Sequence, residues 1–240
     1  MSEFVSEFVC EFQIHRVAHT TKNPTEWERQ DKDQRTKVCF LNCRSIVDKF
    51  QNIKSDRSLL KSNLLILTET WLEENSKEEE YQLPNFTASF CSKGRGKGIA
   101  SYSYDFGFQH VMNINQDGFS ITKLKNEKID IIGIYRSHNG NVVNIVKDLQ
   151  ALLDIERTTV IGGDLNMCAV TEGHNYVTSS LKELGFKQIV IKPTHIDGRT
   201  IDHIYIRNGE NSRYEWTLEY FPKYYSDHDG LGLTLWESDE

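Results

Sequence analysis

The segment Y-Y-S-D-H-D-G, residues 224–230, places a hydroxyl, two carboxylates and an imidazole close together in the chain. Ser226, Asp227 and His228 are consecutive, and Asp229 follows them. Polar segments of this kind are often only a turn before a strand. The triplet alone supports a turn and a reactive site about equally, so its meaning depends on partners from other segments.

Similar polar residues occur at or near the ends of apolar runs that are typical of strands. These polar residues are Asn42, Glu69, Tyr135, Arg136, Asp164, Asn166, Asp202 and His203. If the strand ends converge, the carboxylates of Glu69, Asp164, Asp202 and Asp227 share one site. Carboxylates packed together raise one another's pKa, and a divalent cation relieves that conflict.

The types of these residues indicate which cation and which reaction to expect. Carboxylate and amide oxygens, without cysteine or a cluster of histidines, favour Mg²⁺ or Mn²⁺ over zinc. A hard cation together with an amide, a tyrosine and a histidine is suited to the hydrolysis of a phosphate ester.

Each of these residues also has a simpler interpretation. Asp164 follows two glycines and is compatible with a turn or a helix cap, and Glu69 is compatible with a cap as well. Asp202 is harder to dismiss, because an acid among isoleucines needs a partner when it is buried, and His228 is the candidate. The remaining histidines, His195 among them, are interpreted as surface or internally satisfied side chains.

Composition limits the class of protein. The chain has 240 residues, of which 38% are hydrophobic and 26% charged, so it can bury a core beneath a polar surface. The net charge of -7 opposes nucleic-acid binding at first sight, but the glycine-rich stretch 92–98 is basic. The cationic residues that we expect to contact phosphates are Lys93, Arg95, Lys97, Arg136 and Arg199. The acidic stretch 73–80 is interpreted as a solvated face.

The sequence predicts a nuclear or cytoplasmic protein that neither crosses a membrane nor is secreted. No apolar run approaches the length of roughly 18–20 residues that spans a bilayer. The first residues carry acids where a signal peptide carries bases. The five cysteines are scattered without a C-x-x-C pair, which argues against a zinc ribbon and a disulfide framework.

Hydrophobic patterning predicts an α/β domain over residues 37–240, preceded by an extension or linker over residues 1–36. Helices are expected over 45–61, 141–155 and 175–186. Strands are expected over 37–43, 63–69, 86–90, 98–103, 106–111, 119–124, 128–135, 158–166, 187–191, 201–206, 213–221 and 230–236. Hairpins outnumber parallel crossover units, so two mixed, mostly antiparallel sheets covered by helices are the simplest architecture.

Six motifs in a fixed order resemble one known family. They are L-N-C-R-S, T-E-T-W, I-Y-R, G-G-D-L-N, P-T-H with T-I-D-H-I-Y-I, and S-D-H-D-G. Over roughly residues 37–236 the chain resembles the endonuclease/exonuclease/phosphatase superfamily, which includes deoxyribonuclease I and the apurinic/apyrimidinic endonucleases. Within it, the motifs are most similar to endonuclease domains of non-LTR retrotransposons and of Helitron-type elements. The resemblance implies a four-layer α/β/β/α sandwich whose strand ends form the active site.

The resemblance also implies roles for individual residues. Glu69 corresponds to the principal Mg²⁺ ligand, assisted by Asn42. Asp164 corresponds to the residue that orients or deprotonates the attacking water. Asn166 and Tyr135 correspond to groups that hydrogen-bond the scissile phosphate.

Further positions of the motifs match the side of the site that binds the phosphate. Asp202 corresponds to a residue that fixes the tautomer of His228, and His228 to a contact of a phosphate oxygen. Asp227 corresponds to an acid near the metal or the leaving group. Thr194 and Ser226 correspond to supporting positions.

The resemblance implies a Mg²⁺-dependent endonuclease, with Mn²⁺ able to substitute, that nicks DNA and leaves a 3′-hydroxyl. A phosphatase or phosphodiesterase of the same fold acting on RNA, inositol phosphate or lipid is an alternative, as is an inactive DNA-binding derivative. Arg44 stands where apurinic enzymes carry an acid, which weakens an expectation of abasic-site specificity. The expected partner is DNA and the expected state a monomer, and a polyprotein that carries a reverse transcriptase or a helicase is a compatible context.

Overall fold

The computed structural model describes residues 35–91, 94–169 and 175–238, all of which belong to the unit Gln34–Glu240. The expected extension over residues 1–36 lies outside the described residues except for its last two. Among the residues that the structure describes, none forms a helix long and apolar enough to cross a membrane.

The first of two sheets contains both ends of the described chain. Its strands are, in spatial order, β11 (Tyr214–Phe221), β12 (Gly230–Glu237), β1 (Thr36–Asn42), β2 (Leu64–Thr68), β4 (Ile99–Tyr104) and β3 (Phe86–Cys91). Strands β1 and β2 are parallel, and every other neighbouring pair is antiparallel. The pattern predicts the first strand over 37–43. In the structure this strand, β1, spans Thr36–Asn42 and so lies one residue earlier at each end.

The second sheet repeats this plan with the middle of the chain. Its strands are, in spatial order, β5 (Gln109–Gln116), β6 (Phe119–Lys125), β7 (Ile129–Arg136), β8 (Thr158–Asp164), β10 (Asp202–Arg207) and β9 (Lys187–Gln188). Strands β7 and β8 are parallel, and the other pairs are antiparallel. Both sheets are thus mixed and mostly antiparallel, as the sequence predicts.

Alternating side chains of the central strands build two different cores. On β1, Val38 and Phe40 belong to the core between the sheets, whereas Cys39 and Leu41 belong to the core under the helices. This is the period of two that a strand imposes on its side chains. Because both faces of the strand are covered, the sequence is apolar throughout.

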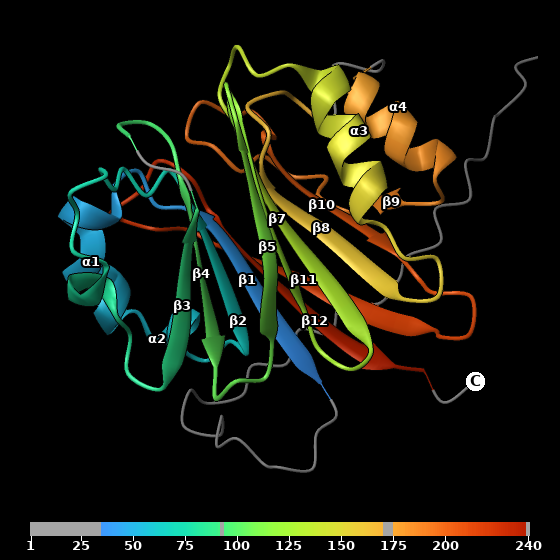
Figure 1. Ribbon diagram of the computed structural model, residues 1–240, viewed down its shortest axis with the longest axis horizontal. Coiled ribbons are helices and arrows are strands. Elements are labelled where there is room, and N and C mark those ends of the chain that lie inside the picture. The colour runs from blue at the N-terminus through green and yellow to red at the C-terminus, as the bar shows by residue number, and fades with distance from the viewer. Residues whose placement is uncertain (1–34, 92–93, 170–174, 239–240) are drawn as a thin grey trace, which may run out of the picture. The chain divides into compact units, whose positions relative to one another are not determined.

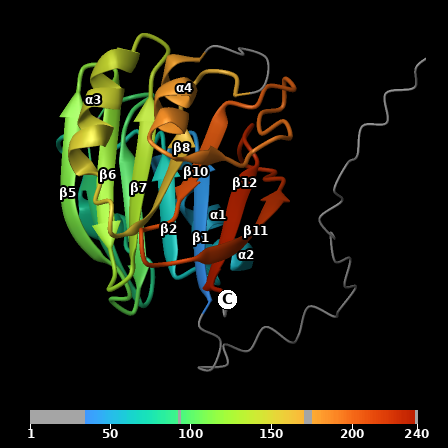
Figure 2. The ribbon, with the colours of Figure 1, turned by 90° about the vertical axis from the view of Figure 1, so that its right-hand side faces the viewer.

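Helices cover the outer face of each sheet. The helices α1 (Ile46–Ser55) and α2 (Arg57–Leu60) cover the first sheet, and α3 (Val142–Leu152) and α4 (Tyr176–Glu183) cover the second. Figure 1 shows the two helical layers on either side of the two sheets, and Figure 2 looks onto α3 and α4. The predicted four-layer α/β/β/α sandwich is therefore confirmed.

Several local predictions need correction. The strand expected over 106–111 lies later in the chain, as β5 over Gln109–Gln116, and the helices expected over 141–155 and 175–186 end at Leu152 and Glu183. The single helix expected over 45–61 is broken at Asp56, whose carboxylate caps α2 and also accepts hydrogen bonds from Lys223 Nζ at 2.5 Å and Tyr225 Oη at 2.7 Å. Asp56 therefore has an extended backbone although the sequence around it has a helical pattern. It is held there by Lys223 and Tyr225, which lie 167 and 169 residues away in the chain. The strand expected over 187–191 is wrong beyond Gln188, where pairing with β10 ends.

The glycines before Asp164 allow β8 to pack closely at the sheet interface. A Cβ on Gly162 would lie 2.6 Å from Phe40 Cε1 on the facing sheet. Gly163 has φ +140°, and a Cβ there would lie 2.0 Å from the carbonyl oxygen of Ile134. Only glycine adopts this conformation at such close approach, so the two glycines determine where Asp164 emerges.

Candidate active site

The polar residues at the strand ends meet at one edge of the sandwich. Strands β1, β2, β7 and β8 end at this edge, because the two central pairs are parallel. Strands β10 and β12 begin there, because each is antiparallel to a central strand. Hydrogen bonds from Asn42 to Asp164 and from His228 to Asp202 join this edge of one sheet to that of the other.

Asp164 is fully buried and lies among amides. Its Oδ2 accepts from Asn42 Nδ2 at 2.8 Å and its Oδ1 accepts from the backbone N–H of Asn166 at 2.8 Å. Burial, followed by the negative charge of Asp202 on the neighbouring strand, raises the pKa of Asp164 to about 8. A carboxyl group with such a pKa is a far stronger base than an exposed aspartate.

Asp202 and His228 form a buried pair next to Asp164. His228 Nδ1 lies 2.8 Å from Asp202 Oδ2, and both side chains are 5% exposed. Burial lowers the pKa of His228, but the carboxylate of Asp202 and those of Asp164 and Asp227 outweigh burial and raise it to about 9. His228 is therefore held in one orientation and favours its cationic form at neutral pH.

Asp227 has an unusual set of neighbours. Its Oδ2 accepts from Arg44 at 2.5 Å and lies 3.2 Å from Nε2 of His195. Its Oδ1 is buried without a hydrogen-bond partner among the described residues and lies 4.0 Å from His228 Nε2. One carboxylate oxygen is thus neutralised, while the other faces the site without a donor.

Glu69 and Tyr135 form the opposite side of the site. Glu69 follows β2 with φ 53° and accepts from Trp71 Nε1 at 3.3 Å and from the hydroxyl of Tyr135 at 3.4 Å. That hydroxyl also donates to the carbonyl oxygen of Gly96 at 2.7 Å. Burial and the charge of Glu69 raise the pKa of Tyr135, so the phenol remains a hydrogen-bond donor.

Ser226 and Thr194 hold the backbone around the reactive groups. The Ser226 hydroxyl donates to the carbonyl oxygen of Asn42 at 2.7 Å and accepts from the N–H of His228 at 3.1 Å. The Thr194 hydroxyl accepts from the N–H of Asp202 at 3.1 Å. Both residues lie in the site and fix the places where β1, β10 and β12 meet.

The arginines expected to contact phosphates have protein partners. Arg136 donates to the carbonyl oxygens of Gly140, Leu165 and His138 at 2.9, 3.0 and 2.9 Å. Arg199 pairs with Asp197 at 2.6 Å, on the exposed turn before β10. The guanidinium of Arg136 therefore contacts backbone carbonyl oxygens and joins the loop after β7 to the loop after β8.

The basic loop lies beside Glu69 and Tyr135. Arg95 stacks over the ring of Trp71 with 5.4 Å between guanidinium carbon and ring centroid, and its side chain is exposed. The exposed Lys97 is tied to the same loop, because its carbonyl oxygen accepts from the N–H of Trp71 at 3.0 Å. Lys93 lies outside the described residues.

Sequence reasoning misses His195 as a site residue. The sequence favours a surface or satisfied histidine there, yet its ring centroid lies 4.8 Å from that of His228 and its Nε2 faces Asp227. A signal is present, because His195 belongs to the P-T-H motif directly after Thr194. The motifs mark Arg44 only as a departure, and its ion pair with Asp227 joins residues 183 positions apart.

The residues at this edge fit a hard divalent cation. Glu69 and Asp227 supply carboxylate oxygens, and Asp227 Oδ1 is buried without a donor among the described residues. An anionic oxygen in that state is stabilised by a cation, and Mg²⁺ prefers carboxylate oxygens. Glu69 with Asp227, assisted by the Asn42 amide, would hold the ion.

Comparison with known proteins identifies the fold. No family model matches the sequence, and no curated protein matches it. An AP endonuclease from Archaeoglobus fulgidus superposes with a TM-score of 0.63 at 17% identity, covering 82% of this chain and 98% of that chain.

Two further solved structures superpose on this chain with slightly lower TM-scores. The endonuclease domain of TRAS1, a telomere-specific non-LTR retrotransposon, gives a TM-score of 0.60 at 13% identity over 84% of this chain and 98% of that domain. The catalytic domain of human nocturnin gives 0.60 at 13% identity over 85% and 94%. These proteins share the DNase I-like α/β sandwich, and the chain described here has the same fold.

Proposed function

We propose that this chain, which has the DNase I-like fold, is a Mg²⁺-dependent endonuclease that nicks DNA and leaves a 3′-hydroxyl. The observation that supports the proposal is the convergence of Asp164, Asp202, Asp227 and His228 at one edge of the sandwich, with Glu69 joined to this edge through the hydroxyl of Tyr135. The similarity to an AP endonuclease and to a retrotransposon endonuclease domain supports DNA as the substrate.

Asp164 is suited to act on the attacking water. Its Oδ1 and Oδ2 are fixed by the Asn166 N–H and the Asn42 amide, so the carboxylate has one orientation. With a pKa raised to about 8, it accepts a proton from water more readily than an exposed aspartate does. It therefore orients the water and takes its proton during attack on phosphorus.

The scissile phosphate is suited to lie between Tyr135 and His228. The cationic imidazole of His228, fixed by Asp202, offers Nε2–H to a non-bridging oxygen as negative charge accumulates there. The phenol of Tyr135 and the amide of Asn166 are neutral donors on the other side. The phenol donates to the carbonyl oxygen of Gly96, and the amide to the carbonyl oxygen of Arg136 and to Asp164 Oδ2, so each would exchange a protein acceptor for a phosphate oxygen. A Mg²⁺ ion held by Glu69 and Asp227 would supply charge stabilisation for the phosphate and for the departing 3′-oxygen.

Arg44 argues for a nuclease without abasic-site specificity. An acid at this position in apurinic enzymes adds negative charge, whereas Arg44 adds positive charge and neutralises Asp227 Oδ2. A single principal carboxylate ligand, Glu69, then remains on the β2 side. We expect intact duplex DNA and abasic duplex to be cleaved at similar rates.

A supercoiled plasmid provides the direct test. With Mg²⁺ the protein should convert supercoiled into open-circular DNA, with Mn²⁺ as a substitute, and excess EDTA should stop the reaction. The nick should carry a 3′-hydroxyl that a DNA polymerase extends without prior phosphatase treatment. Plasmid that stays intact with either ion would refute the proposal.

Matched variants separate the site from general effects on the protein. Glu69→Gln and His228→Asn should each lower the nicking rate by about 10²–10³-fold, because each removes stabilisation of developing charge. Glu127→Gln, an exposed change in the turn before β7, should leave the rate unchanged. A panel containing RNA, an inositol phosphate and a phosphoinositide identifies the alternative: turnover of one of these with inert DNA would reassign the substrate.

A further inference from the structure

His195 and His228 form a second pattern of ligands at the same edge. The two residues are joined by an isolated antiparallel bridge, and their rings meet edge to face with centroids 4.8 Å apart. His195 has no role in the proposed hydrolysis. Both rings turn Nε2 toward the carboxylate of Asp227.

Each imidazole is held on its far side by a carboxylate of its own. His228 Nδ1 lies 2.8 Å from Asp202 Oδ2, and His195 Nδ1 lies 2.6 Å from Asp197 Oδ1. Histidines that bind metal ions commonly donate their other ring N–H to a carboxylate in this way. The outer carboxylates orient both rings, and the backbone N–H of Asp197 also contacts His195 Nδ1 at 3.2 Å.

The distances among the three inner groups suit a small cation. His195 Nε2 lies 3.2 Å from Asp227 Oδ2, and His228 Nε2 lies 4.0 Å from Asp227 Oδ1. Ligand atoms at about 2.0–2.1 Å from a tetrahedral Zn²⁺ are about 3.3 Å apart. One ligand atom from each of the three residues lies within 4.8 Å of the others, so the three groups need only a small closing movement around the ion. Asp227 Oδ1 is buried and has no donor in the described part of the chain, so it is available as a ligand.

We propose that His195, His228 and Asp227 bind a transition cation of the Zn²⁺ type. Two imidazole nitrogens with one carboxylate favour Zn²⁺ over Mg²⁺, which would compete for Asp227 and take its other oxygen ligands from Glu69 and Asn42. A bound Zn²⁺ takes the His228 nitrogen that otherwise faces the phosphate. This consequence rests on the proposed function: zinc inhibits the Mg²⁺-supported reaction by occupying His228 and Asp227.

The positive charge of Arg44 opposes the binding of a cation at Asp227, and this gives a second test of the proposal. Its guanidinium is 2.5 Å from Asp227 Oδ2, and the side chain is 52% exposed. A cation that arrives at Asp227 has to displace this charge. Removing the charge should therefore tighten zinc binding, an effect opposite in sign to the loss of a ligand.

Binding is measured on the full chain without reference to activity. The metal-free protein is titrated with Co²⁺ by visible absorption, and Zn²⁺ affinity is obtained by competition with a chromophoric chelator. His195→Asn should weaken binding by about 10-fold or more, and Arg44→Gln should strengthen it. His138→Asn, which changes an exposed histidine after β7, should bind as the wild type does.

Two results would overturn this zinc site. One is equal affinity for His195→Asn and wild type, with both folded by circular dichroism. The other is a Co²⁺ spectrum with thiolate charge-transfer bands, which would place the ion on a cysteine. Because Arg44→Gln is expected to tighten binding, the proposal stays testable even if His195→Asn does not fold.

Activity separates failure of this site from failure of the proposed nuclease. Glu69→Gln should lose Mg²⁺-supported nicking yet bind Co²⁺ like the wild type. A wild-type protein that binds Co²⁺ through His195 but never nicks DNA supports the zinc site and rejects the nuclease. In an active enzyme, one equivalent of Zn²⁺ should inhibit wild type more strongly than His195→Asn, each relative to its own rate without zinc.

Discussion

Asp130 and Asp164 lie on neighbouring parallel strands, and both are buried, at 1% and 0% exposure. Asp130 is near the start of β7 and pairs with two cations, Lys123 Nζ and Arg157 Nε, each at 2.6 Å. Asp164 is at the end of β8, where its hydrogen-bond partners are amide groups. Two cations therefore neutralise the charge of Asp130, whereas among the described residues no lysine or arginine pairs with Asp164, and burial raises its pKa.

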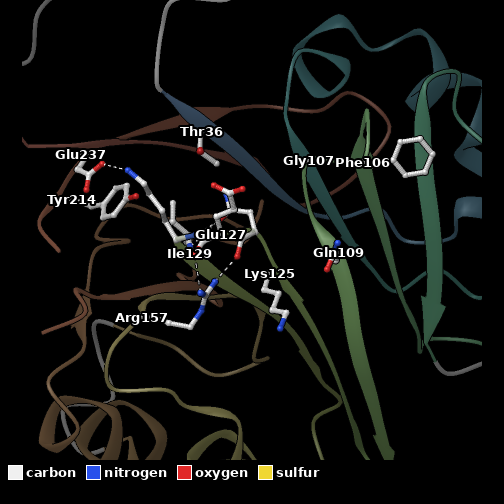
Figure 3. A pocket seen from close by; sticks show the side chains of 12 residues that line it. Thr36, Phe106, Gly107, Gln109, Lys125, Glu127, Ile129, Arg157, Tyr214 and Glu237 are labelled. Carbon is white, nitrogen blue, oxygen red and sulfur yellow. Dashed lines mark hydrogen bonds and ion pairs between the residues drawn. The ribbon is translucent and has the colours of Figure 1, made fainter. Parts of the chain in front are cut away.

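The residues around Asp130 and around Asp164 also differ in how their charges are paired. A hollow of about 760 Å³ lies at the Asp130 edge, and Figure 3 shows Arg157 and Glu237 among its lining side chains. Its lining includes the ion pair between Lys128 and Glu237, and Arg157, which pairs with Asp130. At the Asp164 edge, carboxylates face one another instead. Uncompensated charge, more than the size of a hollow, marks the edge where chemistry is expected.

The largest effects are expected when Asp164 and Asp130 are each replaced by asparagine. Asp164→Asn should lower the nicking rate by about 10²–10⁴-fold, because an amide cannot take a proton from the attacking water. Asp130→Asn should cost about 3 kcal/mol of unfolding free energy and keep the rate per folded molecule, because it strands Lys123 and Arg157. Urea unfolding and plasmid nicking measure both properties.

Asp105→Asn serves as a control for this pair, since Asp105 is exposed in the turn after β4 and asparagine tolerates its φ of 45°. It should change neither property. The comparison fails if Asp164→Asn remains active or if Asp130→Asn is as stable as the wild type.

His203 and His228 extend the comparison to histidines. His203 is buried between neutral partners, the Tyr205 hydroxyl at 2.6 Å and the Met167 carbonyl oxygen at 2.7 Å. Burial lowers the pKa of His203 to about 4, in contrast to the raised pKa of His228. Neutral partners leave burial dominant, whereas carboxylates reverse its effect.

The lowered pKa of His203 predicts an acid-dependent loss of stability. Below the ordinary pKa of 6.5 the unfolded chain binds a proton that the folded protein does not bind until about pH 4. Its contribution is therefore complete above pH 6.5 and falls toward pH 4, by up to about 1.4 kcal/mol per pH unit. In urea unfolding, the stability difference between wild type and His203→Gln should shrink over this window; a constant difference would contradict it.

The basic loop gives the smallest expected effect. Removing Arg95 and Lys97 together should weaken DNA affinity and lower the slope of log K against log salt by about 1 for each phosphate that the loop no longer neutralises. Lys125→Ala, an exposed change at the Asp130 edge, should leave the slope unaltered. Filter binding at several salt concentrations measures this, and identical slopes for loop variant and wild type would exclude the loop from the interface.

Most of the secondary structure could be predicted from the sequence. Strand β1 and the Ser45 cap of α1 follow from neighbouring residue types, and the pairing of Asp202 with His228 is expected because a buried acid among isoleucines needs a partner. The helix break at Asp56 could not be predicted, because its partner Lys223 lies 167 residues away. Local pattern indicated a helix there, and a tertiary hydrogen bond prevailed.

The sequence by itself determined which residue types stand at the strand ends and in which order. Only the tertiary structure decided that Arg44 neutralises Asp227, that Arg136 turns to backbone carbonyls, and that His195 joins His228. The physical reason is that strand and helix patterns depend on residues a few positions apart. Charge compensation and the pKa of Asp164 instead depend on distances across two sheets, which the packing of the sandwich sets.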